Sequence, residues 1–303
     1  MKAPHPIVLT IGVFDGVHLG HQTLLSRAGA LARGLKASAE VLTFQDHPMH
    51  VLGKGPRIPF LLPRQETFEL LEQKGARRVH VLKFTRSFSR KSPEQFVDWL
   101  QGLGDIQGIV VGENFRFGRG AKGDIRLLKA MGKLWGFLVE AVKPVRMGGQ
   151  VVSSSHIRRA LAEGKTEQAN RMLGRPYFIE GEVVHGKHVG HKIGFPTANL
   201  KGIPNFLPKD GVYACAVKLG SRFYRAGMNL GKRPTFQDDD HHRQAEVHLM
   251  HFHGKLYGKR MRVYLLKYLR PERKFPSPTA LVTQIRKDLQ QIQSLSLKGL
   301  KGL

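Results

Sequence analysis

The segment from Thr10 to His21 restricts the fold more than any other part of the chain. It reads TIGVFDGVHLGH and joins an apolar run, 7–13, to a helical pattern over about residues 20–33. Glycines in the turn let a ligand approach the backbone closely, and the free N–H groups at the start of the helix attract anions. A strand, a glycine-rich turn and a helix in this order predict an α/β domain whose first loop binds phosphate groups.

Two histidines, His18 and His21, end this turn. The pattern H-x-G-H is a signature of nucleotidyl transfer, in which two imidazoles contact the same phosphates. The alternative is structural: His18 ends the strand and His21 caps the helix. A short motif needs structural context, and the surrounding strand, turn and helix favour phosphate binding.

The first 173 residues alternate short apolar runs with amphipathic helical stretches. This interleaving predicts a parallel sheet with crossover connections, a doubly wound, Rossmann-like nucleotidyltransferase architecture. Ligands of such sheets bind beyond the carboxyl ends of the strands, where the segment 12–21 and the loop 112–123 fall. The expected strands are 7–13, 39–44, 78–83, 108–112 and 137–142, and the expected helices are 20–33, 63–75, 92–103, 124–136 and 154–164.

The pattern changes after Leu173. Gly174, Arg175 and Pro176 interrupt the helical periodicity, and β-like runs separated by turn residues follow. Successive short strands of this kind predict a small antiparallel β-barrel with a terminal helix. We therefore expect two domains, 1–173 and 174–303. The expected strands are 177–185, 211–218, 223–230, 244–252 and 259–268, and the final helix is expected at 277–293.

The net charge of +26 indicates an anionic partner. Residues 1–173 hold 26 basic and 14 acidic side chains, and residues 174–303 hold 23 and 9, so no single basic tail supplies the excess. A substrate with several phosphates accounts for part of this charge, and nucleic acid is an alternative partner.

Cys215 is the only cysteine, which excludes an intramolecular disulfide and favours a reducing compartment. The first residues lack the pattern of a signal peptide, and no segment approaches roughly 18 consecutive apolar residues. We therefore expect a cytoplasmic protein with no membrane partner. The sequence does not indicate an oligomeric state.

Two further segments of the first half can contact a nucleotide. Ser153 and Ser154 precede a helix that carries Arg158, so hydroxyls, N–H groups and a guanidinium converge there. An ordinary helix cap gives the same pattern. In the loop 112–123, aromatic rings either cover a flat ligand ring or pack the loop down.

The motifs GVFDGVHLGH, FQDHP, GENFRFG and VSSSHIR resemble those of the bacterial bifunctional riboflavin kinase and FMN adenylyltransferase family, the FAD synthetases. That family shows G-x-F-D-G-x-H-x-G-H, F-x-P-H-P, G-x-(D/N)-F-x-F-G and (I/V)-S-S-x-x-I-R in the same order. The chain departs from the second motif at Gln45 and Asp46, where the first proline is lost. The resemblance implies adenylylation of FMN by ATP to give FAD and pyrophosphate. It assigns charge stabilisation to His18, His21 and Arg158, ATP contacts to Gly12, Phe14, Asp15, Gly16, Ser153 and Ser154, and flavin contacts to Asn114, Phe115 and Phe117. In the second half of the chain, the resemblance to the same family adds Arg270 as a flavin contact.

The segment 192–200, KIGFPTANL, has a chemical interpretation of its own. Pro196 restricts the backbone, and Thr197 and Asn199 place two oxygen donors on one side of an extended segment. Neutral oxygen ligands, together with phosphates and water, suit Mg²⁺. For the tripeptide Thr197-Ala198-Asn199 alone, the alternative is a turn in which the Asn199 side chain satisfies its own backbone.

The block GRPYFIEGEVVHGKHVGHKIGFPTANL, with GVYACAV, NLGKRPTF, EVHLMHF, LYGK and LRPERKF, resembles the riboflavin kinase module of the same family. The resemblance thus runs from about residue 7 to residue 290. It assigns Mg-ATP binding to Gly186, Gly190, Thr197 and Asn199, and it makes Glu246 the base for the attacking hydroxyl of riboflavin. His191 and His251 take the places of the family's usual Arg and Asp.

Histidines and aspartates between residues 238 and 253 lack the spacing of a transition-metal site. Two alternative functions stay open. One is a monofunctional riboflavin kinase whose first domain has decayed. The other is a basic nucleic-acid-binding protein on a nucleotidyltransferase-like scaffold, for which nucleic acid would be required.

Overall fold

The computed structural model describes residues 5–53, 55–186, 193–232, 243–297 and 300. Contacts within the chain divide it into two compact units, Met1–Ser153 and Ser154–Leu303. We call them the sheet unit and the barrel unit.

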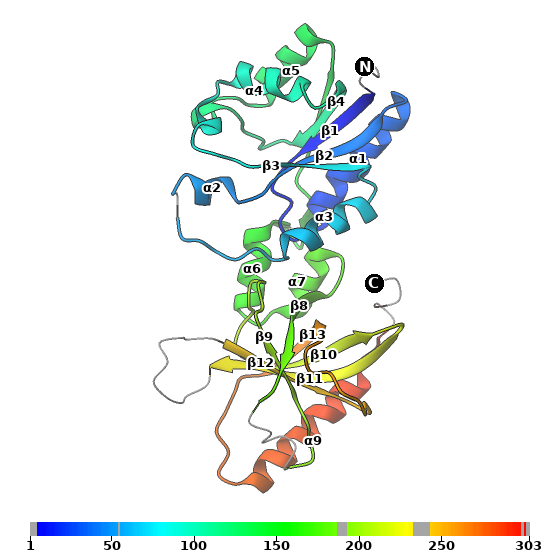
Figure 1. The fold of residues 1–303 in the computed structure, drawn as a ribbon, viewed down its shortest axis with the longest axis vertical. Coiled ribbons are helices and arrows are strands. Elements are labelled where there is room, and N and C mark those ends of the chain that lie inside the picture. Colours follow the sequence, from blue (N-terminus) through cyan, green and yellow to red (C-terminus); the bar gives the residue numbers. More distant parts are fainter. Residues whose placement is uncertain (1–4, 54, 187–192, 233–242, 298–299, 301–303) are drawn as a thin grey trace. The chain divides into compact units, whose positions relative to one another are not determined.

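The sheet unit contains a five-stranded parallel sheet in the order β3-β2-β1-β4-β5 (Figure 1). The first strand in the chain lies at the centre of the sheet, and the carboxyl ends of all five strands share one edge. The expected Rossmann-like architecture is confirmed. The strands are β1 (Pro6–Ile11), β2 (Ser38–Phe44), β3 (Arg78–Leu82), β4 (Asp105–Gly112) and β5 (Leu138–Val142).

Strand β1 is buried on both faces because helices cover both sides of the sheet. Ile7 and Leu9 pack into one cluster with residues of α4 and α5, whereas Val8 packs into another with residues of α1. This alternation follows from the two-residue period of a strand. The long helices of this unit are α1 (Leu19–Gly34), α3 (Arg64–Gln73), α4 (Pro93–Gln101) and α5 (Ile125–Trp135).

Several short elements were not expected from the sequence. They have too few residues for a periodic hydrophobic pattern. They are α2 (Pro48–Val51), η1 (Phe88–Arg90), η2 (Arg119–Ala121), β6 (Arg146–Met147) and β7 (Gln150–Val151).

Two helices, α6 (Ser154–Ala162) and α7 (Thr166–Leu173), belong to the barrel unit. Asn170 of α7 explains the attachment, because its amide donates to Leu265 O at 2.8 Å and accepts from Tyr177 N at 2.7 Å. In the sequence these helices continue the helix-rich first part. Their contacts place them with the strands that follow.

The barrel unit is a closed antiparallel barrel in the order β10-β11-β12-β9-β8-β13, which confirms the expected fold class (Figure 1). Strand β9 was not expected, because four residues carry little periodicity. Helix α9 (Pro278–Ser294) follows the last strand. The strands are β8 (Tyr177–Val184), β9 (Ala198–Lys201), β10 (Gly211–Leu219), β11 (Arg222–Lys232), β12 (Arg243–Leu249) and β13 (Arg260–Arg270).

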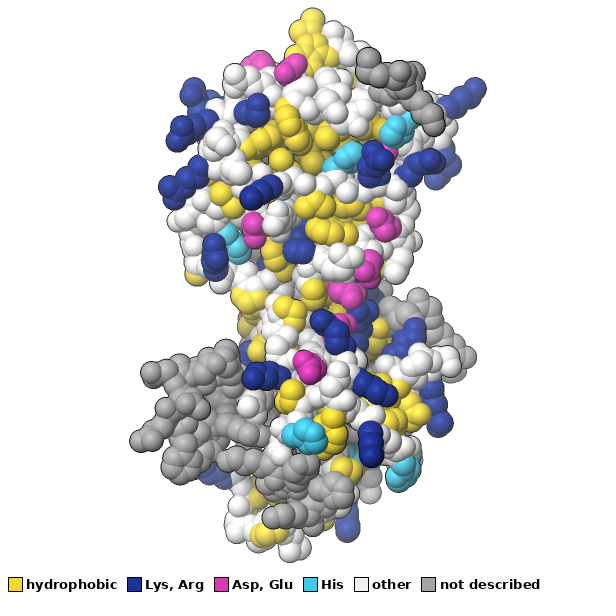
Figure 2. All heavy atoms as spheres, viewed as in Figure 1, with side chains coloured by type: hydrophobic (Ala, Val, Ile, Leu, Met, Phe, Trp, Pro, Cys, Tyr) yellow, Lys and Arg dark blue, Asp and Glu magenta, His cyan; other side chains and the backbone are white. Residues whose placement is uncertain are grey.

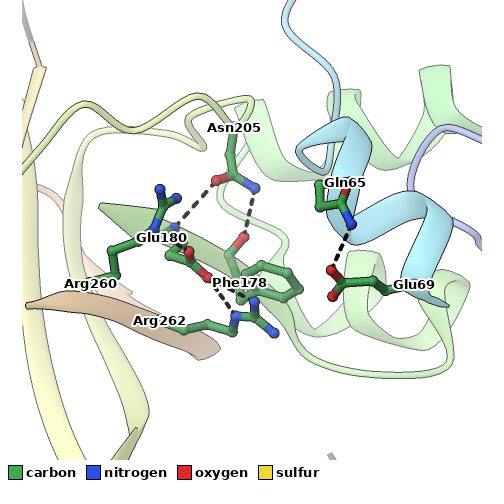
Figure 3. Close-up of polar contacts among 7 residues, drawn as sticks. All are labelled: Gln65, Glu69, Phe178, Glu180, Asn205, Arg260 and Arg262. Atoms are coloured by element: carbon green, nitrogen blue, oxygen red, sulfur yellow. Dashed lines mark hydrogen bonds and ion pairs between the residues drawn. The ribbon is translucent and has the colours of Figure 1, made fainter. Parts of the chain in front are cut away.

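A buried carboxylate joins β8 to β13. Glu180 accepts hydrogen bonds from Arg260 Nε at 2.8 Å and from Arg262 Nε at 2.9 Å (Figure 3). Burial alone would raise the pKa of Glu180, but the two guanidinium groups outweigh it and hold the pKa below its ordinary value. Asn205 adds a loop to this network by donating to Phe178 O at 3.3 Å.

On the face drawn in Figure 2, Lys and Arg side chains lie scattered over both units and do not gather in one patch. This distribution agrees with the even spread of basic residues along the sequence. Among the described residues, no helix combines the length and apolarity that crossing a membrane requires.

The sheet unit holds a second buried carboxylate, Glu40 of β2, which is 1 % exposed. It accepts from His5 Nε2 at 2.8 Å, His80 Nε2 at 2.5 Å and Ser38 Oγ at 3.1 Å. Burial by itself raises the pKa of Glu40, but these hydrogen bonds more than compensate and its pKa lies below the ordinary 4.5. The ionised form therefore stabilises the folded sheet unit.

We predict that Glu40→Gln lowers the free energy of unfolding of the sheet unit by about 2 kcal/mol at neutral pH. The difference in free energy of unfolding between the wild type and the variant should be full above pH 4.5. It should disappear as the pH falls through the lowered pKa of Glu40 in the native state. Urea unfolding followed by tryptophan fluorescence measures this unit alone, because Trp99 and Trp135, the only tryptophans, both lie in it. An equal difference at acidic and neutral pH would contradict the prediction.

Candidate functional sites

The first candidate site is the turn between β1 and α1, beyond the carboxyl end of the central strand. Phe14, Gly16 and Val17 have φ angles of 54°, 79° and 39°. Such angles are costly for Phe and Val, so packing has to hold them. Both side chains are fully buried, and Val17 N donates to Phe14 O at 3.1 Å. The turn is therefore held in one shape by the core beneath it.

Asp15 and Gly12 both support this turn. The buried Asp15 carboxylate accepts from Leu61 N at 2.7 Å, which ties the turn to a distant loop. A Cβ atom on Gly12 would lie 3.2 Å from the Phe14 ring. Asp15 and Gly12 thus shape the loop. Their contacts with ATP stay a prediction.

The structure brings His18 and His21 together. Their rings are stacked, with centroids 3.7 Å apart and planes inclined by 17°. His18 is the N-cap of α1 and its Nδ1 accepts from His21 N at 3.4 Å, so His18 caps the helix and His21 does not. Because helix N-termini attract anions, both imidazoles lie where phosphate groups would bind.

Gly20 leaves room for the His18 ring. A Cβ atom at Gly20 would lie 3.1 Å from His18 Cε1 and 3.2 Å from its Nδ1. Both contacts are closer than ordinary van der Waals packing, so with a side chain at residue 20 the imidazole would have to shift by a few tenths of an ångström.

Arg64 is a residue of this edge that the sequence analysis did not single out. Its guanidinium lies between the ends of β1 and β2 and donates to Val13 O at 3.2 Å and to Phe44 O at 2.5 Å. It also contacts the rings of Phe60 and Phe68, each 4.9 Å from Arg64 Cζ. Arg64 therefore fixes the two strand ends from which the turn emerges.

Burial lowers the pKa of Arg64 to about 10, against the opposing effect of the Asp15 and Asp46 carboxylates. The altered loop thus places a negative charge, Asp46, near this guanidinium. Next to it, Gln45 N donates to Leu82 O at 2.9 Å and extends the pairing of β2 with β3.

The remaining residues predicted for adenylyl transfer are distributed over both units. Ser154 and Arg158 lie on α6 of the barrel unit, so their approach to the histidines stays a prediction. Phe117 is 5 % exposed within the core and stacks on Phe115 with centroids 5.6 Å apart. The structure thus gives both rings a packing role, whereas Asn114 is exposed.

The second candidate site is on the barrel. Glu246 of β12 is directly opposite Asn199 of β9 on one side and Asn229 of β11 on the other. Ala245 and Val247, on the other face of β12, are fully buried. Residues opposite one another share a face of the sheet, so these three form one row outside the barrel core, here called the outer-face row.

Asn199 supplies a buried oxygen to this row. Its Oδ1 is inaccessible to solvent and accepts no hydrogen bond from any described residue. A Cβ atom at Gly186 would overlap the Asn199 amide, so only glycine lets this backbone approach it. The alternative in which the asparagine oxygen satisfies its own backbone is thereby excluded.

His248, on the same face of β12, holds the segment that contains Thr197. Its Nδ1 is 2.8 Å from Pro196 O, and its ring meets Phe195 edge-on at 5.7 Å. This contact places the Thr197 region beside β12. Gly190 and His191 lie outside the described residues.

Arg270 pairs with α9. Its Nε donates to Asp288 Oδ1 at 3.2 Å, and a terminal nitrogen donates to Asp288 Oδ2 at 2.8 Å. This bidentate pair anchors the last helix to β13, and flavin binding by Arg270 stays a prediction. Within the described residues, no group of three or more His, Cys, Asp or Glu side chains could hold a metal ion.

Comparisons with known proteins match two families along the chain. The family described as FAD synthetase matches residues 1–156, and the family described as riboflavin kinase matches residues 173–296. The chain belongs to the family of bifunctional riboflavin kinases/FMN adenylyltransferases.

Relatives of that name cover nearly the whole chain. The protein of Bacillus subtilis is 38% identical over 94% of this chain and 90% of its own length. The protein of Escherichia coli K12 is 36% identical over 93% of this chain and 90% of its own length. A crystal structure from Streptococcus pneumoniae, described as a macrolide-efflux protein, has a TM-score of 0.89 at 31% identity and covers 98% of this chain and 96% of its own. The fold is shared, and the efflux description applies only to that protein.

We predict that Gly20→Ala lowers the rate of the FMN adenylyltransferase reaction about 10- to 100-fold by displacing His18. Gly29→Ala is the matched control in the same helix, because its new Cβ would have no contact closer than 3.7 Å. Chromatographic separation of FMN and FAD measures both variants. Equal rates for the two variants would show that the position of His18 does not matter.

Proposed function

We propose that residues 174–303 phosphorylate riboflavin to FMN and that residues 1–173 adenylylate FMN to FAD with release of pyrophosphate, with ATP as co-substrate in both reactions. The two family matches support this division of the chain. The observation that carries the kinase assignment is the outer-face row, in which a carboxylate lies beside a buried asparagine oxygen.

In the kinase reaction, Glu246 accepts the proton of the terminal ribityl hydroxyl as the oxygen attacks the γ-phosphorus of ATP. The strand alternation supports this role, since it turns Glu246 away from the apolar interior. Mg-ATP binding is also proposed for Gly190 and for Gly186, whose backbone approaches the Asn199 amide closely.

The donor set fits Mg²⁺, because Asn199 Oδ1 is a neutral buried oxygen without a hydrogen-bond donor among the described residues. Thr197 and Asn199 would hold the ion. When bound, it neutralises negative charge on the transferring phosphoryl group.

In the adenylyl transfer, the FMN phosphate attacks the α-phosphorus of ATP without a covalent enzyme intermediate. His18, His21, Ser154 and Arg158 stabilise charge on the phosphates and on departing pyrophosphate. The stacked imidazoles at the start of α1 support this assignment. ATP contacts are proposed for Gly12, Phe14, Asp15, Gly16, Ser153 and Ser154, and flavin contacts for Asn114, Phe115 and Phe117. Arg270 of the barrel unit is proposed separately as a flavin contact.

We also propose a cytoplasmic location, with riboflavin, FMN and ATP as the ligands and no requirement for nucleic acid. A chain with one cysteine forms no intramolecular disulfide, which supports a reducing compartment. Burial raises the pKa of the Cys215 thiol, so this residue acts as a small apolar side chain.

The first prediction from this division concerns Glu246→Ala. It should abolish FMN formation from riboflavin and leave FAD formation from supplied FMN unchanged, because the base serves only the kinase reaction. Purified protein with ATP and Mg²⁺ is incubated with either flavin, and the products are separated by chromatography. Loss of both activities in a folded variant would overturn the division into two sites.

The second prediction is the reciprocal one. His21→Ala should lower FAD formation at least about 100-fold and leave riboflavin phosphorylation at the wild-type rate. The same assay tests the alternatives, because a monofunctional kinase yields FMN without FAD and a nucleic-acid-binding protein yields neither. An unchanged rate of FAD synthesis would remove His21 from the site.

A further inference from the structure

The outer-face row extends beyond the base, to Asn229. This residue is directly opposite Glu246 on the side away from Asn199. Its Nδ2 donates to Glu272 Oε1 at 2.7 Å, so a second carboxylate stands at the end of the row.

The contact with Glu272 fixes the orientation of the Asn229 amide. A carboxylate only accepts hydrogen bonds, so the amide nitrogen must face it and Oδ1 must point elsewhere. Asn229 Oδ1 is inaccessible to solvent and accepts no hydrogen bond from any described residue. Leaving a buried acceptor unsatisfied costs roughly 1–3 kcal/mol. A donor from a bound ligand would recover that free energy.

Two glycines flank Asn229 on the same face of β11. A Cβ atom at Gly231 would overlap the carboxylate of Glu272, so glycine at this residue admits Glu272. A Cβ atom at Gly227 would lie 3.1 Å from Ile292 Cδ1 of α9. On this face of β11, the Asn229 side chain therefore lies between a glycine next to Glu272 and a glycine next to Ile292.

Asn229 is too far from Asn199 to share a metal ion with it. Opposite residues on neighbouring strands have Cβ atoms about 4.5–5.5 Å apart, which separates the two asparagines by roughly 10 Å. Two oxygens bound to one Mg²⁺ each lie about 2.1 Å from it. The phosphates of ATP are proposed to bind on the Asn199 side of Glu246. The Asn229 side of Glu246 then remains for the hydroxyl groups of the ribityl chain.

We propose that Asn229 is a substrate-binding residue of the kinase reaction. Its Oδ1 accepts a hydrogen bond from the hydroxyl next to the terminal hydroxyl that Glu246 deprotonates, and Glu272 is the positioning residue for the amide. The substrate class is therefore a polyol chain with two adjacent hydroxyls at its end. This inference rests on the proposed kinase function of residues 174–303.

The first test compares riboflavin with an analogue that lacks the hydroxyl next to the terminal one. Asn229→Ala should raise the KM for riboflavin about 5- to 10-fold and leave the KM for ATP unchanged. The wild-type protein should discriminate against the analogue, since a site that accepts a hydroxyl rejects a ligand without it. The variant should lose that discrimination.

Arg222→Ala is the control, since Arg222 is an exposed residue at the other end of β11. It should keep both KM values and the discrimination. Thermal unfolding checks that each variant is folded, and Asn229→Ser, which is also too short to place an amide oxygen in the site, replaces the alanine variant if that one unfolds.

The second test addresses Glu272. Glu272→Gln keeps an oxygen that can accept from Asn229 Nδ2, whereas Glu272→Leu removes it. The glutamine variant should bind riboflavin like the wild type, and the leucine variant should bind it several-fold more weakly, as measured by quenching of flavin fluorescence without ATP. A purely structural role would weaken both variants or neither.

Three results would overturn the inference. They are an unchanged KM for riboflavin in Asn229→Ala, an increase in the KM for ATP or in the Mg²⁺ requirement instead, and undiminished discrimination against the analogue. Failure of the proposed function is a different result, because the wild-type protein itself would then form no FMN.

Discussion

Register between neighbouring strands is the constraint on which both sites depend. In the barrel, the pairing of β9, β12 and β11 aligns Asn199, Glu246 and Asn229. A slip of one residue in β12 would turn Glu246 into the apolar interior and bring Val247 to the outside. Because the barrel is closed, every strand is paired on both sides and such a slip would disturb the whole ring. The fold thus specifies the position of Glu246, the proposed base, before any ligand contributes.

In the sheet unit, parallel pairing brings the strand ends together, but it does not fix the loops beyond them. Arg64 does so by donating to the carbonyl groups of Val13 and Phe44 at the ends of two neighbouring strands. The left-handed turn that follows is held by buried Phe14 and Val17, so strain in the backbone is compensated by the core. Preorganisation of this kind supports the proposal that His18 and His21 contact phosphates with little rearrangement.

The sequence predicted the helices and strands that have a long periodic pattern. It did not predict elements of only a few residues, or residues whose role depends on a contact with a distant part of the chain. The Rossmann-like sheet and the barrel were predicted because their strands alternate or run apolar over five residues or more. Strand β9 has four residues, and its place in the barrel comes from pairing with β8 and β12. Arg64, Asn229 and Glu272 belong to no signature recognisable in one sequence. Their importance arises from neighbours far along the chain, and only the folded structure brings these together.

Both asparagines of the outer-face row keep a buried oxygen without a donor among the described residues. Such groups cost stability, so a chain that retains two of them around one carboxylate has to compensate elsewhere. Other carboxylates of the barrel are paired: Glu180 joins β8 to β13, and Asp288 joins α9 to Arg270. The carboxylates of these pairs accept hydrogen bonds from guanidinium groups, whereas the two amide oxygens of the row have no donor among the described residues. The contrast between satisfied and unsatisfied polar groups therefore distinguishes the paired carboxylates of the barrel from the row that is proposed to bind substrate.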